Sequence, residues 1–175
     1  MAYRILIIDD DSSVRCSVKR ALEVSGYAIV HAENGEHGLE DYKREDFDLL
    51  LLDLDLPELK GWEILEYATA HRPEIPVVLL TGMLSECEAG SFAGTDAVLE
   101  KPTDARKLLT ALESALAESR TERMERLRNG FLKTPFLPAH GASPSPAEGL
   151  YAPGLPAHAA GRPSPLLSTE ASICD

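Results

Sequence analysis

Short apolar runs alternate with longer amphipathic segments over the first two thirds of the chain. The runs are rich in Val, Ile and Leu and carry almost no charge, which is the pattern of strands covered on both faces of a parallel sheet. On this basis we expect strands at residues 4–8, 27–31, 49–52, 76–80 and 97–99.

The segments between the runs have the apolar spacing of helices. The first of them places Val14 and Leu22 on one face, and Asp11 or Ser12 can cap its start. Gly26 supplies a left-handed residue at which this helix can end. Further helices are expected around residues 35–42, 62–68 and 85–93 and from residue 104, the last of them continuing as a charged, solvated end to residue 127.

Five strand–helix units in succession predict an α/β fold. Right-handed crossovers between the strands give a parallel sheet with helices on both faces, as in doubly wound proteins. In such a sheet, ligands bind beyond the carboxyl ends of the strands. The side chains that follow each strand are therefore the first candidates for a functional site.

The composition of the chain changes at residue 130. The segment 130–175 holds eight of the twelve prolines and five of the twelve glycines, with few charges and no sustained apolar period. Such a segment cannot bury enough surface to offset the entropy lost in ordering it. We therefore expect one domain at residues 1–119, a helical extension at 120–129 and a disordered tail at 130–175.

The chain is acidic, with 17 Lys and Arg residues, 29 Asp and Glu residues and a formal net charge of −12. Because this charge repels the phosphates of nucleic acids and no basic stripe offsets it, we expect no nucleic-acid partner. The folded part has no apolar run of the roughly 18 residues that a membrane span needs, and the start lacks a secretory signal, which favours a cytoplasmic protein. Cys16, Cys87 and Cys174 lack the spacing of disulfides or zinc sites, and the first two are expected to pack in the fold.

Acidic, hydroxyl and ammonium groups stand where the expected strands end. Asp9 and Asp10 follow the first strand, Asp53 and Asp55 the third, Thr81 the fourth and Lys101 the fifth. Taken singly, an aspartate at a strand end is more often a turn residue or a helix cap than a ligand. Gathered at one sheet edge, however, carboxylates repel one another unless a cation neutralises them, and their oxygens suit Mg²⁺ shared with a phosphoryl group. A threonine hydroxyl and a lysine ammonium are natural partners for the oxygens of that phosphoryl group.

Four sequence blocks occupy these strand ends in a fixed order: IIDDD at residues 7–11, LLLLDLDLP at 49–57, LLTG at 79–82 and EKP at 100–102. Their order and spacing resemble the receiver domain of two-component response regulators, and the resemblance covers residues 3–119. It implies a flavodoxin-like, doubly wound five-stranded parallel sheet in the order 2-1-3-4-5 with five helices. It also implies a phosphoryl group taken from a histidine kinase or a phosphotransfer protein.

The resemblance assigns a role to each acidic residue. Asp53 is the phosphoacceptor, and an aspartate is a competent nucleophile for forming an acyl phosphate. Asp10 and Asp53 hold Mg²⁺ or Mn²⁺ through their carboxylates, Asp55 through its backbone carbonyl and Asp9 mostly through water. No other cofactor is implied. Phosphoryl transfer then depends mainly on in-line positioning and on charge neutralisation by metal and cation.

The resemblance also implies roles for Thr81 and Lys101 and a conformational change that follows phosphorylation. Thr81 and Lys101 contact the phosphoryl oxygens, and the Lys101–Pro102 bond is cis. Receivers usually carry an aromatic residue three positions before this lysine, and here the residue is Val98. We therefore expect a switch that does not depend on the rotation of an aromatic ring.

The output is expected to be protein binding. The segment beyond residue 129 is too short and too rich in proline for a helix-turn-helix module, which favours a stand-alone regulator and not an enzyme, apart from its own phosphorylation and dephosphorylation. Its unknown downstream protein would bind the face made by residues 85–93, by strand 97–99 and by the helix from residue 104. A short apolar seam along that helix allows a monomer or a weak homodimer.

Two other interpretations stay open. Asp53-Leu54-Asp55 is similar to the D-x-D motif of haloacid-dehalogenase-type, Mg²⁺-dependent phosphatases, but those enzymes place their acidic pair after the lysine, and here Asp9 and Asp10 come first. The second is a receiver-like scaffold that binds partners without phosphorylation. Turnover of a small phosphoester would support the phosphatase, and one stable, metal-dependent acyl phosphate would support the receiver.

Overall fold

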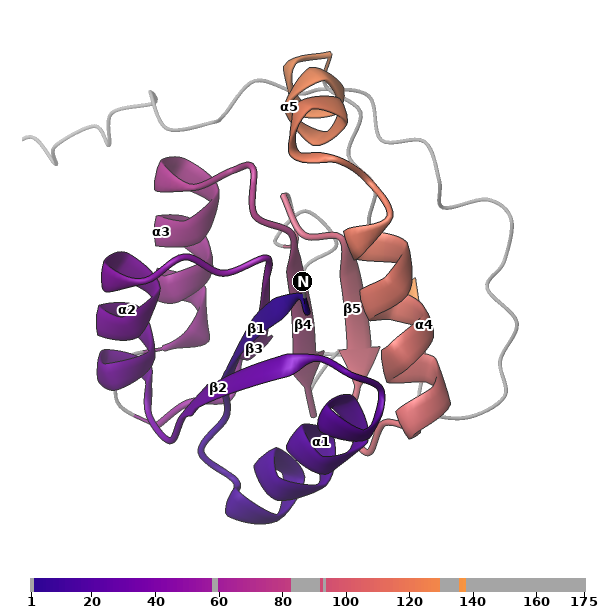
Figure 1. Ribbon diagram of the computed structural model, residues 1–175. Coiled ribbons are helices and arrows are strands. Elements are labelled where there is room, and N and C mark those ends of the chain that lie inside the picture. The colour runs from indigo at the N-terminus through magenta and orange to yellow at the C-terminus, as the bar shows by residue number, and fades with distance from the viewer. Residues whose placement is uncertain (1, 58–59, 83–91, 93, 130–135, 138–175) are drawn as a thin grey trace, which may run out of the picture.

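The computed structural model describes residues 2–57, 60–82, 92, 94–129 and 136–137. Its strands are β1 (Arg4–Ile8), β2 (Ala28–Ala32), β3 (Leu49–Asp53), β4 (Val77–Thr81), β5 (Ala97–Glu100) and β6 (Phe136–Leu137). Its helices are α1 (Ser12–Val24), α2 (Gly35–Arg44), α3 (Gly61–His71), α4 (Ala105–Leu116) and α5 (Arg120–Arg128), arranged around the sheet as Figure 1 shows.

The strands form one parallel sheet in the order β2-β1-β3-β4-β5-β6. The first five strands follow the predicted order 2-1-3-4-5, so the flavodoxin-like, doubly wound topology is confirmed. β1 lies between β2 and β3, with Ile5 in register with Ile29 on one side and Leu49 on the other. Because every pair is parallel, the carboxyl ends of the strands lie at one edge of the sheet.

An apolar core covers each face of the sheet. In β1, Ile5 and Ile7 belong to the core shared with α1 and α4, and Leu6 and Ile8 belong to the core shared with α2 and α3. Figure 1 shows these two helix pairs on opposite sides of the sheet. All residues of β3 and β4 are buried, which explains why their apolar runs are uninterrupted.

Helix α1 begins and ends at the residues that the sequence indicated. The side chain of Asp11 accepts hydrogen bonds from the backbone N–H groups of Ser13 and Val14, at 2.8 and 3.2 Å. Gly26 follows the helix with a φ of 89°, the left-handed conformation that glycine adopts without strain. The capping aspartate and the glycine were therefore sufficient to predict where this helix begins and ends.

The structure corrects the prediction of one continuous last helix. α4 ends at Leu116, and α5 begins separately at Arg120. Ser119 caps α5 in a capping box with Glu122, and this reciprocal pair of bonds favours a new helix start over continuation. β2 and β4 each lie one residue later than predicted.

Helix α5 is not the solvated end that its charged sequence indicated. The Arg123 side chain is 3% exposed, and its guanidinium donates to the carbonyls of Pro73 and Gly94, at 2.7 and 3.1 Å. It also pairs with the buried carboxylate of Asp96, which Arg126 contacts at 3.1 Å. Burial raises the pKa of Asp96 although both arginines oppose the rise. The extension is therefore anchored to the segments that precede β4 and β5.

A short strand lies within the segment predicted to be a disordered tail. Phe136–Leu137 pairs in parallel with Val98 and Leu99 of β5, so the prediction of disorder is wrong at these two residues. The edge of β5, which is formed by residues distant in sequence, supplies the pairing groups that composition alone could not reveal. The rest of the tail, Cys87 and, apart from residue 92, the helix predicted at 85–93 lie outside the described residues.

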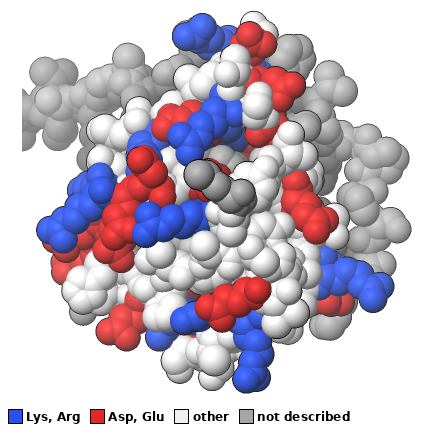
Figure 2. All heavy atoms as spheres, viewed as in Figure 1, with Lys and Arg blue, Asp and Glu red and all other residues white. Residues whose placement is uncertain are grey.

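Opposite charges are interspersed on the surface. On the face drawn in Figure 2, Lys and Arg side chains lie beside Asp and Glu side chains and do not form a continuous basic band. Ion pairs such as Arg72 with Asp46, at 2.6 Å, join the two kinds of charge. Within the described part of the chain, none of the helices has the length and apolar character needed to cross a membrane.

Candidate functional site

The carboxyl ends of four strands bring the predicted site residues together. Asp9 follows β1, Asp53 ends β3, Thr81 ends β4 and Lys101 follows β5. The first three are at most 1% exposed. The backbone N–H of Lys101 donates to the carbonyl of Thr81 at 2.8 Å, and the Lys101–Pro102 bond is cis, as predicted. The pairing that builds the sheet therefore also positions the site.

Lys101 bridges the two buried carboxylates. Its Nζ lies 2.6 Å from Asp53 Oδ2 and 3.0 Å from Asp9 Oδ2. The other oxygen of each carboxylate accepts a backbone hydrogen bond from two residues further on, since the N–H groups of Asp55 and Asp11 donate at 3.0 and 2.9 Å. Each acid thus directs one oxygen to its own loop and the other to the lysine.

Burial is the largest influence on the ionisation of Asp53. Desolvation raises the pKa of its carboxyl, the charge of Asp9 adds to the rise, and hydrogen bonds from Lys101 and from the Asp55 N–H oppose it. For Lys101, burial lowers the pKa, but the hydrogen bond to Asp53 and the negative charges of Asp53 and Asp9 outweigh burial and raise it. The lysine is therefore a stable cation facing two carboxylates, and a further cation would be favourable there.

Asp9, Asp10 and Asp53 can hold a metal ion. One oxygen of each lies within 4.8 Å of the others. Asp9 Oδ2 is buried, and its contact with Lys101 lacks the alignment of a hydrogen bond, so this oxygen has acceptor capacity left. Asp10 is exposed, which opens the group to solvent. An oxygen-only donor set with room for water fits Mg²⁺.

Asp55 takes part through its side chain as well as its backbone. Its carboxylate oxygen Oδ2 accepts a hydrogen bond from the backbone N–H of Gly82 at 2.8 Å. Because Gly82 follows Thr81, this bond joins the loop after β3 to the loop after β4. The role of the Asp55 carbonyl as a metal ligand stays a prediction.

Two residues that sequence reasoning missed support the site. Arg15 Nη1 donates to the carbonyl of Asp9 at 2.7 Å. A Cβ at Gly61 would lie 2.4 Å from the carbonyl oxygen of Asp53, so the start of α3 packs directly on the backbone of that residue. A basic residue near a helix start is unfavourable for the helix dipole. The position of Arg15 therefore indicated that its side chain has another partner.

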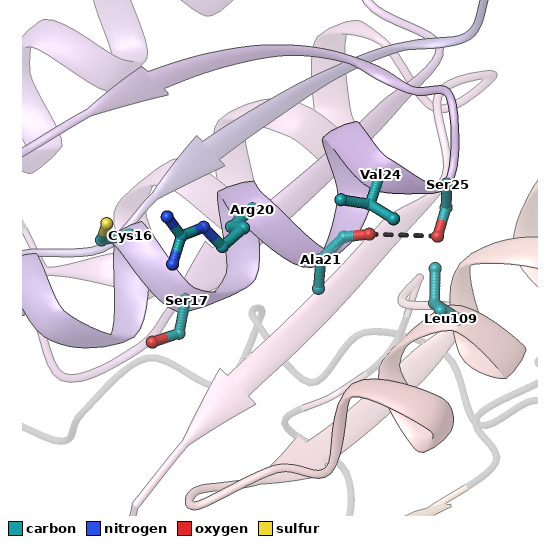
Figure 3. Close-up of a pocket in the computed structure, with 7 residues that line it drawn as sticks. All are labelled: Cys16, Ser17, Arg20, Ala21, Val24, Ser25 and Leu109. Atoms are coloured by element: carbon teal, nitrogen blue, oxygen red, sulfur yellow. Dashed lines mark hydrogen bonds between the residues drawn. The ribbon is translucent and has the colours of Figure 1, made fainter.

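An open groove lies outside the acidic site. It runs between α1 and α4, has a volume of about 470 Å³ and is lined in part by Arg20, Val24 and Leu109 (Figure 3). Cys16 also lines it and is exposed, so the prediction that Cys16 packs in the fold is wrong. Cys16 stands two positions before Val18, and residues at this spacing face different sides of a helix. None of the six candidate site residues lines this groove.

Comparison with known proteins agrees with this geometry. The chain matches the family model described as "Response regulator receiver domain" over residues 5–113. Response regulator MprA of Mycobacterium ulcerans (strain Agy99) is 35% identical over 124 residues, which cover 70% of this chain and 53% of that protein. Response regulator receiver protein CpdR of Brucella abortus (strain 2308) is 36% identical over 115 residues, which cover 65% of this chain and 96% of that protein.

A solved structure gives the same result. Response regulator protein TrrA from Thermotoga maritima, crystallised in complex with Mg²⁺-BeF, has a TM-score of 0.62 and 28% identity, covering 66% of this chain and all of that one. The chain spans about half the length of MprA. Receiver domains bind Mg²⁺ at an acidic pocket and interact with histidine kinases or phosphotransfer proteins. With its parallel sheet, its acidic cluster and these matches, the chain belongs to the response regulator receiver domain family.

Proposed function

We propose that Asp53 is the phosphoacceptor of this receiver and takes its phosphoryl group from a histidine kinase or a phosphotransfer protein. The observation that carries the proposal is the position of Asp53, which contacts the Lys101 ammonium at 2.6 Å and lies in the carboxylate group with Asp9 and Asp10. A carboxylate between a fixed cation and a cation-binding group can attack a phosphoryl group whose charge both would neutralise.

The proposed metal site uses the acids around Asp53. The carboxylates of Asp10 and Asp53 and the backbone carbonyl of Asp55 would hold Mg²⁺ or Mn²⁺, with Asp9 acting mostly through water. When bound, the metal supplies positive charge to the phosphoryl oxygens. The Mg²⁺-BeF complex of the similar TrrA protein supports this assignment.

Thr81 and Lys101 are proposed to contact the phosphoryl oxygens. Phosphorylation would then draw Thr81 toward Asp53 and rearrange the loops after β3 and β4, which the bond from Gly82 to Asp55 already joins. At the position where receivers usually carry an aromatic residue, Val98 is 1% exposed. The proposed response therefore needs no ring rotation. Unchanged amide exchange on adding beryllofluoride would contradict it.

The proposed output is phosphorylation-dependent binding of another protein in the cytoplasm, with no nucleic-acid partner and as a monomer or weak homodimer. The binding face would comprise residues 85–93, β5 and α4. CpdR supports a protein of this kind, because it is named a receiver protein and this chain matches 96% of its length.

Intact-mass analysis after treatment with acetyl phosphate and Mg²⁺ tests the proposal. Wild type should gain a single phosphoryl group, and neither Asp53→Asn nor wild type in EDTA should gain one. Turnover of a small phosphoester without a stable adduct would point instead to a phosphatase. No adduct in either protein would leave the phosphorylation-independent scaffold as the better account.

A further inference from the structure

Strand β5 has an outer edge that faces away from the rest of the receiver sheet. On its inner side β5 pairs with β4, from Ala97 opposite Val78 to Glu100 opposite Thr81. The backbone groups that point outward would form a template for another strand if nothing paired with them. Main-chain pairing with such an edge is a general way for one protein to bind an extended peptide of another.

The chain's own strand β6 pairs with this edge over two residues. Phe136 lies in register with Val98, and Leu137 with Leu99, parallel to β5. Pro135 and Pro138 flank this dipeptide in the sequence. Proline has no N–H and cannot donate to a strand ladder, so the sequence restricts the length of this pairing. A strand of two residues forms few hydrogen bonds with the edge of β5, so a longer strand can displace it.

The anchor of α5 keeps this occupant close to the edge. Arg123 pairs with Asp96, the residue directly before β5, and Asn129 caps the end of α5. Residues 130–135 then lead to β6. A short connection from an anchored helix gives the dipeptide a high effective concentration at β5, which offsets the weakness of its pairing.

We propose that the outer edge of β5 is a docking site for an extended segment of a partner protein, and that Phe136–Leu137 covers this edge when the partner is absent. The segment that fits is an apolar strand running parallel to β5 and pairing over more residues than β6 does. Because Lys101 follows β5 directly, the bound segment would lie on the strand that leads into the acidic site. The proposal does not depend on phosphorylation of Asp53.

Hydrogen–deuterium exchange of the full chain tests the pairing with β6. The double substitution Phe136→Pro with Leu137→Pro removes both N–H groups of the dipeptide, whereas the matched exchange Phe136→Leu with Leu137→Phe keeps them. We expect β5 amides to exchange at least about tenfold faster in the proline variant and as in wild type in the control. Unchanged β1 protection would show that the variant is folded. Equal β5 protection in all three proteins would overturn the proposal.

A synthetic peptide KTVFLVAH tests the docking site. It has the sequence of residues 133–140 with valine in place of both prolines, so it can pair with β5 over more residues than β6 does. Labelled with a fluorophore, it should bind the proline variant at least about tenfold more tightly than wild type, because wild type carries its own competitor. The same peptide methylated at the two backbone nitrogens of Phe and Leu should not bind either protein. Binding of the unmethylated peptide to the wild-type protein is a second test of the β5 edge, and it needs no variant. Failure of the unmethylated peptide to bind, or β5 protection that depends on protein concentration and so reports a second copy, would overturn the proposal.

Discussion

The ammonium group of Lys101 lies between the carboxylates of Asp9 and Asp53. Removing it with Lys101→Met leaves two buried negative charges facing each other, and we predict a loss of about 3 kcal/mol in the free energy of unfolding. Urea unfolding in EDTA measures this loss. Millimolar Mg²⁺ should recover much of it, because the metal replaces the missing positive charge. Equal losses with and without Mg²⁺ would contradict metal binding by these acids.

The raised pKa of Asp53 predicts a different response to Asp53→Asn. An acid whose pKa is raised by folding costs stability when ionised, and this cost disappears as the pH falls through the folded pKa toward the usual value of 3.8. Because Lys101 keeps Asp9 as a partner, Asp53→Asn should stabilise the metal-free protein by about 1 kcal/mol near neutral pH. The gain should shrink in acid. Urea titrations across this range check the sign, and a less stable variant at neutral pH would contradict it.

The residues of the site differ in how visible they were in the sequence. Asp9, Asp53, Thr81 and Lys101 could be predicted to meet because the carboxyl ends of parallel strands share one edge. The sequence marks Arg15 only as a basic residue near a helix start. Its contact with a backbone carbonyl could not be predicted, because that contact depends on how a helix lies against a loop.

The start of α3 rests on the backbone of Asp53 at Gly61, where a Cβ would lie 2.4 Å from the carbonyl oxygen of Asp53. We predict that Gly61→Ala destabilises the protein by about 2 kcal/mol, since the backbone has to shift. It should also weaken Mg²⁺ binding, because the shift moves Asp53, which we propose as a ligand of the metal. Gly26→Ala is the matched control, since its φ of 89° is strained for alanine but its Cβ would meet nothing within 4 Å. Urea unfolding and Mg²⁺ titration of both variants check this, and equal Mg²⁺ affinities would contradict it.

The elements themselves were predictable to within about one residue where a local signal marked their ends. β1 and β3 end at acids, and α1 begins at a capping aspartate and ends before Gly26. The break between α4 and α5 was missed although Ser119 and Glu122 carry the signature of a capping box. The charged sequence around them also suits a continuous helix, and local preference alone could not decide between the two.

The folded unit of the molecule includes α5. Arg123 joins it to Pro73, Gly94 and Asp96, and its loss would leave the Asp96 carboxylate buried with weaker compensation. We predict that Arg123→Met lowers the free energy of unfolding by about 3 kcal/mol. Adding Asp96→Asn to that variant should recover part of the loss, because it removes the buried charge. Arg128 is exposed on the same helix, so Arg128→Met is the control and should change little. Urea unfolding of wild type, Arg123→Met, Asp96→Asn and the double variant measures the coupling, and a purely additive result would contradict the ion pair.

The pairing of Phe136–Leu137 with β5 could not be predicted from the sequence, because it joins residues that lie far apart in the chain. A proline-rich segment has too little apolar surface to fold alone, so its composition correctly predicts that it has no core of its own. Its partner, the edge of β5, is made by residues about forty positions away and exists only once the sheet has formed.

We propose above all that Asp53, which contacts Lys101 and lies close to the carboxylates of Asp9 and Asp10, carries the phosphoryl group. The most direct test treats the chain with acetyl phosphate and Mg²⁺, reduces the product with borohydride, which converts an aspartyl phosphate to homoserine, and locates the homoserine by tandem mass spectrometry. We expect homoserine at position 53 alone, and none when Mg²⁺ is withheld. Homoserine at position 9, 10 or 55 instead, or none at all in the folded protein with Mg²⁺ present, would contradict it.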